Sequence, residues 1–226
     1  MRVHVAFTPA EEGSAPLGIV VDVVRATSSI AQALASGYER VLCCREIDEA
    51  RALRVELGDD AVVGGERNAV VVDGFDVGAS PREFAQGARA RTLILTTTNG
   101  TASILTAAAR CETVVLGSLL NLSAVTSSVE DDVAIFCAGF KGTFAFDDAY
   151  CAGRIVARLG NVSKTDAALA AELLARAYPD ARDGLNARTY GPPGLEADIE
   201  YCARVDALDV VPRFTRMVGT AAEVVA

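Results

Sequence analysis

A run of hydroxyl, amide and glycine residues directly follows an apolar stretch and precedes an alanine-rich helical stretch. Leu93–Leu95 lead into residues 96–101, which read Thr-Thr-Thr-Asn-Gly-Thr. The first backbone N–H groups of a helix have no partner within the helix, and the helix dipole is positive at that end. Because a desolvated hydroxyl needs a hydrogen-bond partner, threonines at this place fit an anion-binding turn. An ordinary Ser/Thr helix cap is the alternative interpretation.

A second apolar run ends in an acidic residue. Residues 19–22 read Ile-Val-Val-Asp, and Arg25 and Thr27 follow where a helix is expected to begin. An Asp at the end of a buried strand costs free energy unless it is paired or bound to a metal ion. An Asp22–Arg25 ion pair with Thr27 as a helix cap is the alternative to a functional site.

A third run, Val133–Cys137, leads through Lys141 to the adjacent carboxylates of Asp147 and Asp148, ahead of an expected helix over 149–159. Mg²⁺ prefers one or two carboxylates together with substrate oxygens and water. Complementation of the helix dipole, worth about 0.3–1 kcal/mol, is an equally simple role for this pair.

A fourth segment combines glycines with charged residues. Residues 64–68 read Gly-Gly-Glu-Arg-Asn, and residues 74–81 read Gly-Phe-Asp-Val-Gly-Ala-Ser-Pro. Four glycines so close together imply special backbone geometry or a close approach of the backbone to another group. Taken with the three strand ends, these acids, arginines, glycines and hydroxyls indicate a site for phosphate and a metal ion.

The apolar pattern predicts alternating strands and helices that would bring these segments together. Strands are expected over residues 2–7, 18–23, 40–44, 61–63, 69–72, 92–96, 112–116 and 133–137. Helices are expected over 47–57, ended by Gly58, and over 167–178 after a capping-box-like sequence at 163–166. This alternation predicts a three-layer α/β/α sandwich with a largely parallel or mixed sheet, in which ligands bind beyond the carboxyl ends of the strands.

Length and composition fit a single domain over residues 1–226. The chain has 226 residues, of which 51% are hydrophobic, so it can bury a sizeable core. Residues 179–198 are rich in Pro, Gly, Asp and Arg without periodicity, which predicts a long loop and a candidate lid. A plain surface connection is the commoner role of such a segment.

The net charge limits which partners the protein is expected to bind, and the cysteine spacing indicates its location in the cell. A net charge of −9 without a Lys/Arg cluster argues against a nucleic-acid partner, but an anionic substrate is compatible because local groups decide its binding. No cysteine pair has CxxC spacing, which is typical of reduced thiols in a cytoplasmic protein. The N-terminal residues do not read as a signal peptide, and no apolar run is long enough to span a membrane. A homodimer is expected from base rates alone.

Several known phosphate chemistries do not fit the sequence. A GxxxxGK[ST] motif is absent, and no cysteine has an arginine six positions later. The single histidine, His4, lies in the first expected strand, which makes histidine-dependent mechanisms improbable. Val24 occupies the place of the second aspartate expected of a haloacid-dehalogenase-type enzyme. A phosphatase with this sequence must therefore use a metal ion, carboxylates and backbone donors.

Four groups of residues, in the same order along the chain, resemble segments of the 2-phosphosulfolactate phosphatases, the ComB family of coenzyme M biosynthesis. The similarity covers about residues 2–212. Residues 22–30 are similar to the DVLRATTTI-type segment of that family, residues 65–83 to its GER…GFD…NSPxE region, residues 96–101 to its TTTNGT, and residues 137–153 to its CAG…(E/D)D…CAG run. Ala69 and Ala79 depart from the pattern, where glycine and asparagine are expected.

The resemblance implies a Mg²⁺-dependent phosphatase that hydrolyses 2-phosphosulfolactate to 3-sulfolactate and phosphate. The expected catalytic residues are Asp22, Arg25, Asp147 and Asp148. The leading magnesium ligands are Asp22, Asp147 and Asp148, with Glu66 and Asp76 as further candidates. The residues expected to bind substrate or phosphate are Arg25, Thr27, Arg67, Ser80, Thr97, Thr98, Asn99, Gly100, Thr101 and Lys141.

Three questions stay open at the level of sequence. The nucleophile is either metal-bound water or one of the aspartates. The substrate is either 2-phosphosulfolactate or another small phosphorylated hydroxy acid. A non-catalytic protein that binds an organophosphate is the third alternative, although the joint presence of Asp22, Asp76, Asp147 and Asp148 weighs against it.

Overall fold

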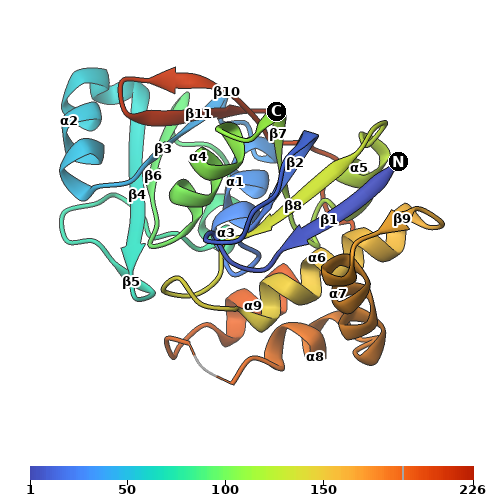
Figure 1. The fold of residues 1–226 in the computed structure, drawn as a ribbon. Coiled ribbons are helices and arrows are strands. Elements are labelled where there is room, and N and C mark those ends of the chain that lie inside the picture. The colour runs from blue at the N-terminus through green and yellow to red at the C-terminus, as the bar shows by residue number, and fades with distance from the viewer. Residues whose placement is uncertain (190) are drawn as a thin grey trace.

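The structure is a computed structural model that describes residues 1–189 and 191–226. Within these residues, one mixed sheet of eleven strands has the order β5-β4-β6-β3-β11-β10-β7-β2-β8-β1-β9 (Figure 1). The strands are β1 (Arg2–Ala6), β2 (Ala15–Val21), β3 (Arg40–Cys44), β4 (Ala61–Arg67), β5 (Val70–Val71), β6 (Thr92–Thr96), β7 (Cys111–Gly117), β8 (Val133–Cys137), β9 (Ser163–Lys164), β10 (Arg213–Val218) and β11 (Ala221–Val225).

Helices cover both faces of the sheet. They are α1 (Ala26–Ala35), α2 (Ile47–Leu57), α3 (Pro81–Phe84), α4 (Gly100–Ala108), α5 (Leu122–Ser127), α6 (Phe146–Leu159), α7 (Asp166–Ala177), α8 (Ala181–Asn186) and α9 (Glu196–Cys202), with a 3₁₀ turn at Gly58–Asp60. Figure 1 shows α6, α7, α8 and α9 gathered at one end of the molecule, whereas α2 lies at the opposite end beside β4. The predicted α/β/α sandwich is therefore confirmed.

The buried side chains of the central strands alternate between two cores. Ile19 of β2 and Ile135 of β8 belong to a cluster with residues of α5 to α9. Val20 and Phe136, their neighbours in sequence, belong to a second cluster with residues of α1, α3 and α4. Successive side chains of a strand point to opposite faces, so continuous apolar runs are the sequences that such doubly covered strands require.

The sheet contains two groups of parallel strands, joined by an antiparallel hairpin. Strands β4, β6 and β3 run parallel to one another, as do β7, β2, β8 and β1. The hairpin β10–β11 lies between them, where β11 pairs with β3 and β10 pairs with β7. The sequence pattern did not predict this hairpin, because most side chains of β10 are exposed and give no apolar run.

Two sequence predictions need correction. Residues 179–198 are not one long loop, since they contain α8 and the start of α9. Helices of six and seven residues are too short to show an apolar period, although Asp180 caps α8 by accepting a hydrogen bond from the backbone N–H of Asp183 at 3.0 Å. Position 190 of this segment lies outside the described residues. The capping box at 163–166 is also wrong, since Ser163 and Lys164 form β9 and Thr165 caps α7 by accepting a hydrogen bond from Ala168 N.

No helix in the described part of the chain is long and apolar enough to cross a membrane. The six cysteines, at positions 43, 44, 111, 137, 151 and 202, are free thiols. Burial raises the pKa of Cys43 and of Cys202 to about 12, so these two thiols are protonated and unreactive at neutral pH.

Candidate active site

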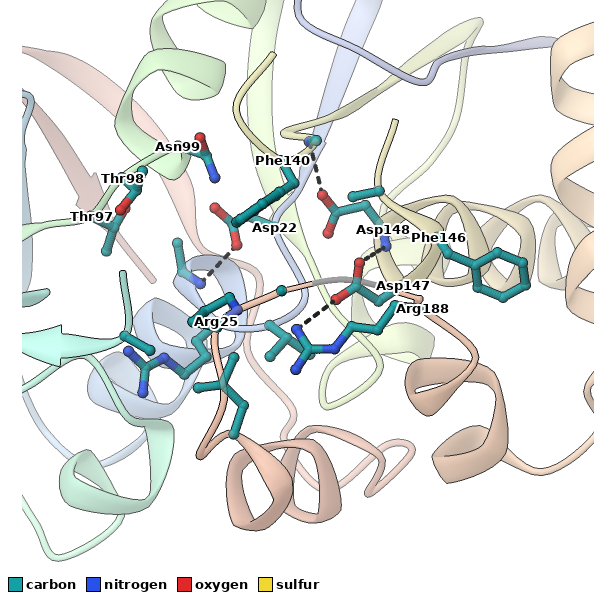
Figure 2. A pocket seen from close by; sticks show the side chains of 18 of the residues that line it. Asp22, Arg25, Thr97, Thr98, Asn99, Phe140, Phe146, Asp147, Asp148 and Arg188 are labelled. Atoms are coloured by element: carbon teal, nitrogen blue, oxygen red, sulfur yellow. Dashed lines mark hydrogen bonds and ion pairs between the residues drawn. The ribbon is translucent and has the colours of Figure 1, made fainter. Parts of the chain in front are cut away.

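One cavity lies where β2, β4, β6 and β8 end and where the segment between α8 and α9 passes. Its described lining residues are Asp22, Val24, Arg25, Ala26, Glu66, Asn68, Ala69, Ala79, Thr97, Thr98, Asn99, Gly139, Phe140, Phe144, Ala145, Phe146, Asp147, Asp148, Ala187, Arg188, Thr189, Gly191, Pro192 and Leu195. Figure 2 shows the acidic side chains of this set in the middle of the view. The segments that the sequence analysis singled out therefore meet at one place.

Asp22 follows β2 and is 8% exposed. Its Oδ1 accepts a hydrogen bond from the backbone N–H of Ala26 at 3.2 Å, which fixes the carboxylate over the start of α1. A Cβ on Gly100, the first residue of α4, would lie 3.2 Å from Asp22 Oδ2 and 2.5 Å from the Cβ of Ala26. Only glycine permits this close approach, which brings the threonine-rich turn to the carboxylate of Asp22.

Burial, followed by the negative charges of Asp147 and Glu66, raises the pKa of Asp22 to about 7. Burial and the charges of Asp147 and Asp22 also raise the pKa of Asp148 well above its ordinary range. Acidic groups that destabilise one another's charged forms in this way accumulate where a cation or a proton-transfer step is needed.

Asp148 is held on both oxygens by backbone groups. It accepts hydrogen bonds from Val23 N at 2.9 Å and from Gly139 N at 3.0 Å. These contacts tie the first turn of α6 to the segments that follow β2 and β8. Asp148 thus positions the walls of the cavity, with one backbone hydrogen bond on each of its oxygens.

Asp147, also in the first turn of α6, has longer contacts than Asp148. Its Oδ1 accepts a hydrogen bond from Asp148 N at 3.1 Å, and its Oδ2 lies 3.8 Å from Nη1 of Arg188. Burial raises the pKa of Asp147, and the nearby Arg188 charge acts in the opposite direction. Figure 2 shows this pair on the side of Asp22 away from Thr97, Thr98 and Asn99.

Glu66 organises the threonine-rich turn. Its Oε1 accepts hydrogen bonds from the backbone N–H and the hydroxyl of Thr98, both at 2.9 Å. Its Oε2 accepts a hydrogen bond from Ala69 N at 2.7 Å. Asn99 is the N-cap residue of α4, and its side chain makes no capping hydrogen bond. The Ser/Thr-cap interpretation of this turn is therefore wrong, and the Asn99 amide is available to the cavity.

Arg25 pairs with Asp198 and not with Asp22, so the alternative of an Asp22–Arg25 ion pair is wrong. Its Nη1 lies 2.7 Å from Oδ2 of Asp198, which comes from α9. The other oxygen of Asp198 accepts a hydrogen bond from the hydroxyl of Ser80 at 2.6 Å. A residue far along the chain thus fixes the guanidinium at the edge of the cavity.

Several predicted site residues lie outside the described lining and serve the surrounding structure. Thr27 donates its hydroxyl to the carbonyl of Asp22 at 2.9 Å, and Thr101 donates to the carbonyl of Cys44 at 3.0 Å. Ser80 bonds to Asp198, as described above. Gly100 contributes close approach and no side chain.

Three predicted charged residues also lie outside that lining. Arg67 donates hydrogen bonds to the carbonyl of Glu66 at 2.7 Å and to the hydroxyl of Thr96 at 3.0 Å. Asp76 accepts a hydrogen bond from Val63 N at 2.9 Å and pairs with Arg54 at 3.5 Å. Lys141 is exposed, with its Nζ 5.3 Å from the centre of the Phe140 ring. The structure therefore does not bring these three side chains together with Asp22.

Sequence reasoning missed Arg188 and the aromatic wall. Arg188 lies between α8 and α9, in a segment without a motif, and its cationic type was the only available signal. Phe140, Phe144 and Phe146 flank the cavity on the side of α6. The grouping of three phenylalanines between residues 140 and 146 was the only signal in the sequence.

The carboxylates fit a metal ion that takes only part of its ligands from the protein. Among the residues that the structure describes, no three His, Cys, Asp or Glu side chains are grouped closely enough to hold a metal ion by themselves. Asp22 and Asp147 each retain an oxygen that no backbone donor occupies. One or two carboxylates completed by substrate oxygens and water are the usual ligands of Mg²⁺.

Comparison with known proteins gives a consistent result. A family model described as 2-phosphosulpholactate phosphatase matches residues 5–217. A protein of Clostridium acetobutylicum named probable 2-phosphosulfolactate phosphatase is 36% identical over 209 residues, which cover 87% of this chain and 88% of that protein. Proteins of the same name from Thermotoga petrophila and Thermus thermophilus are 35% and 36% identical, over 93% and 98% of this chain and 94% and 98% of their own lengths.

Proposed function

Because the chain belongs to the 2-phosphosulfolactate phosphatase family, we propose that it is a phosphoric monoester hydrolase that cleaves 2-phosphosulfolactate to 3-sulfolactate and phosphate, with Mg²⁺ as cofactor. The observation that carries the proposal is the convergence of Asp22, Asp147 and the turn of residues 97–99 on one cavity. A coenzyme M pathway and a location in the cytoplasm are further proposals, supported by the family and by the free thiols respectively.

The phosphoryl group is proposed to lie against the turn that opens α4. The amide of Asn99 and the first backbone N–H groups of α4 are donors at the positive end of a helix dipole. Arg25, fixed by Asp198, adds a guanidinium whose fork can hold two phosphoryl oxygens. Donors aimed at the oxygens on which charge develops are the main means of catalysis in phosphoryl transfer.

Asp22 and Asp147 are proposed to hold the magnesium ion, which would neutralise charge on the phosphoryl oxygens when bound. Asp148 and Glu66 keep the cavity walls in place through the backbone contacts described above. Hydrolysis breaks the bond between phosphorus and the ester oxygen. The electron pair and a proton go to the leaving hydroxyl of sulfolactate, and the oxygen of one water molecule joins the phosphate. We propose that a carboxylate oxygen of Asp22 or Asp147 that does not bind the ion takes the proton of that water.

The proposal is tested by measuring phosphate release from 2-phosphosulfolactate, 2-phospholactate and 3-phosphoglycerate by the purified protein. With Mg²⁺ present, we expect the highest kcat/KM for 2-phosphosulfolactate and no turnover in excess EDTA. Equal activity in EDTA would exclude the magnesium proposal. Absence of phosphate release from all three compounds would exclude the phosphatase proposal.

A second substrate is favoured by one observation. Ala79, which stands where the family pattern has asparagine, lines the cavity. Loss of an amide at this place removes a polar group that could contact a substrate oxygen. A kcat/KM for 2-phospholactate or 3-phosphoglycerate above that for 2-phosphosulfolactate would assign the enzyme to another phosphorylated hydroxy acid.

A further inference from the structure

Two arginines line the described part of the cavity, and they differ in how firmly acidic residues hold them. Arg25 makes a charge-assisted hydrogen bond of 2.7 Å to Asp198. Arg188 approaches Asp147 at 3.8 Å, which is an ion-pair distance but too long for a hydrogen bond. The guanidinium donors of Arg188 are therefore less committed to a protein carboxylate than those of Arg25.

Arg188 is nevertheless half-buried and positioned. Its side chain is 17% exposed. A Cβ on Gly191 would lie 3.0 Å from Nη1 and 3.3 Å from Cζ of Arg188, so the absence of a side chain at 191 lets the guanidinium lie against the backbone. Because Arg188 lines the cavity and is only partly exposed, an anionic group of a ligand can complete its hydrogen bonds there.

The connection that leads into α8, ahead of Arg188, is tied to the helix that carries Asp147. Tyr150 of α6 donates its hydroxyl to the carbonyl of Tyr178 at 3.1 Å, at the start of the connection to α8. Arg154, one turn later in α6, donates to the same hydroxyl at 2.6 Å. The helix that ends two residues before Arg188 thus begins from a connection that is held against α6.

The cavity has an anion-binding group at each of two separate sides. Figure 2 shows Thr97, Thr98 and Asn99 on one side, Arg188 on the other, and Asp22 between them. A phosphate at the turn cannot also occupy the guanidinium on the opposite side. The arrangement therefore suits a small ligand that carries a second anionic group a few bonds from its phosphate.

We infer that Arg188 binds the sulfonate of the substrate and is the residue that selects for it. The inference rests on the proposed function and deepens it. A sulfonate has three oxygens, which match the planar fork of a guanidinium better than the point charge of a lysine. The carboxylate of Asp147, at 3.8 Å, keeps the cation oriented without occupying all of its donors.

The kinetic test compares Arg188→Gln with Arg182→Gln as a matched control. Arg182 lies in α8 near Arg188, is 63% exposed and pairs with Glu200, so its loss changes the charge of the same segment outside the cavity. We expect Arg188→Gln to lower kcat/KM for 2-phosphosulfolactate about 10- to 150-fold, mainly through KM, since a charged hydrogen bond contributes roughly 1.5–3 kcal/mol. For 2-phospholactate, which lacks only the sulfonate, we expect a change below threefold. An equal loss for both substrates would overturn the inference.

A binding measurement keeps the inference testable without turnover. By calorimetry, the wild-type protein should bind 3-sulfolactate more tightly than lactate. The Arg188→Gln variant should lose this preference. Arg188→Lys should keep part of it, and the control Arg182→Gln should keep all of it. Binding of 3-sulfolactate that is unchanged in Arg188→Gln, or absent from the wild type, would contradict the role of Arg188.

The two measurements separate this inference from the proposed function. If the wild-type protein binds 3-sulfolactate through Arg188 but releases no phosphate from 2-phosphosulfolactate, the phosphatase proposal fails and the sulfonate site remains. If it releases phosphate and Arg188→Gln affects both substrates alike, the phosphatase proposal remains and the sulfonate site fails.

Discussion

At the scale of single residues, the cavity contains groups whose burial lowers the free energy of unfolding. Asp22, Asp147 and Asp148 are each less than a tenth exposed. Their carboxylates raise one another's pKa and share few cationic partners, so the arrangement destabilises the folded state at neutral pH. Natural proteins tolerate such costs where the groups are needed for function.

Ala69 is a second costly residue of the cavity. Its φ is +66°, a left-handed conformation that favours glycine, and this explains why the family pattern has glycine there. We expect Ala69→Gly to raise the free energy of unfolding by about 1 kcal/mol, measured by urea denaturation. Ala170→Gly, at an exposed position inside α7, should have the opposite sign and lose about 0.5–1 kcal/mol. A loss of stability in Ala69→Gly would contradict this explanation.

At the scale of elements, α9 acts on the cavity through a single side chain. Asp198 is 5% exposed and holds both Arg25 and the hydroxyl of Ser80 at the start of α3. Asp198 therefore positions the guanidinium, although it is not itself among the described lining residues of the cavity. The contact joins the last helix to the segment after β2.

We expect Asp198→Asn to lower kcat/KM for the substrate about 10-fold or more, with the larger effect on KM, because the neutral amide no longer holds Arg25 in place. Glu200→Gln, in the same helix but 63% exposed, is the matched control and should remain within twofold of the wild type. If Asp198→Asn lowers the melting temperature but leaves KM unchanged, Asp198 has only a structural role.

At the scale of the whole molecule, the last two strands join the two groups of parallel strands. Glu223 of β11 is 6% exposed and accepts hydrogen bonds from Arg40 of β3 at 3.1 Å and from Arg216 of β10 at 2.8 Å. The contact with Arg216, and then that with Arg40, lowers the pKa of Glu223. This acidic residue links three neighbouring strands of the sheet.

A carboxyl group with a lowered pKa stabilises the fold above its unfolded pKa, and this contribution is lost as the pH falls through the folded value. We therefore expect Glu223→Gln to lower the free energy of unfolding by about 1–3 kcal/mol at pH 7, and by progressively less as the pH falls from the unfolded pKa of about 4.3 through the lower folded pKa. Denaturation curves at several pH values measure this difference. Glu112→Gln, at an exposed position in β7, should change stability by less than about 0.5 kcal/mol. A deficit in Glu223→Gln that is independent of pH would contradict the ionic role of Glu223.

The sequence pattern predicted the strands that are buried on both faces of the sheet. The bounds of β3, β6 and β8 agree with the expected 40–44, 92–96 and 133–137, because continuous apolar runs end sharply there. The hairpin β10–β11 was not predicted, because most side chains of β10 are exposed and because the strands that flank the hairpin, β3 and β7, are distant in sequence. Its place between β3 and β7 depends on long-range pairing, which no local pattern encodes.

For the site, the sequence showed which residue types follow each strand but not where their side chains point. Asp22 and Asn99 were correctly placed at one cavity. Arg67 and Asp76 are charged residues of the kind expected in such a site, yet both form hydrogen bonds with nearby backbone groups instead of lining the cavity. Arg188 follows α8 in a segment without a motif, so its place in the lining of the cavity became visible only in three dimensions.

The central claim is that Asp22 acts in a phosphatase centre formed with Asp147 and the turn of residues 97–99. The most direct measurement is kcat for phosphate release from 2-phosphosulfolactate by Asp22→Asn with Mg²⁺ present, beside Asp76→Asn, whose carboxylate lies outside the described lining of the cavity. We predict a kcat about 100- to 1000-fold lower for Asp22→Asn and within threefold of the wild type for Asp76→Asn. A loss below threefold in Asp22→Asn, with unchanged affinity for Mg²⁺, would contradict the account.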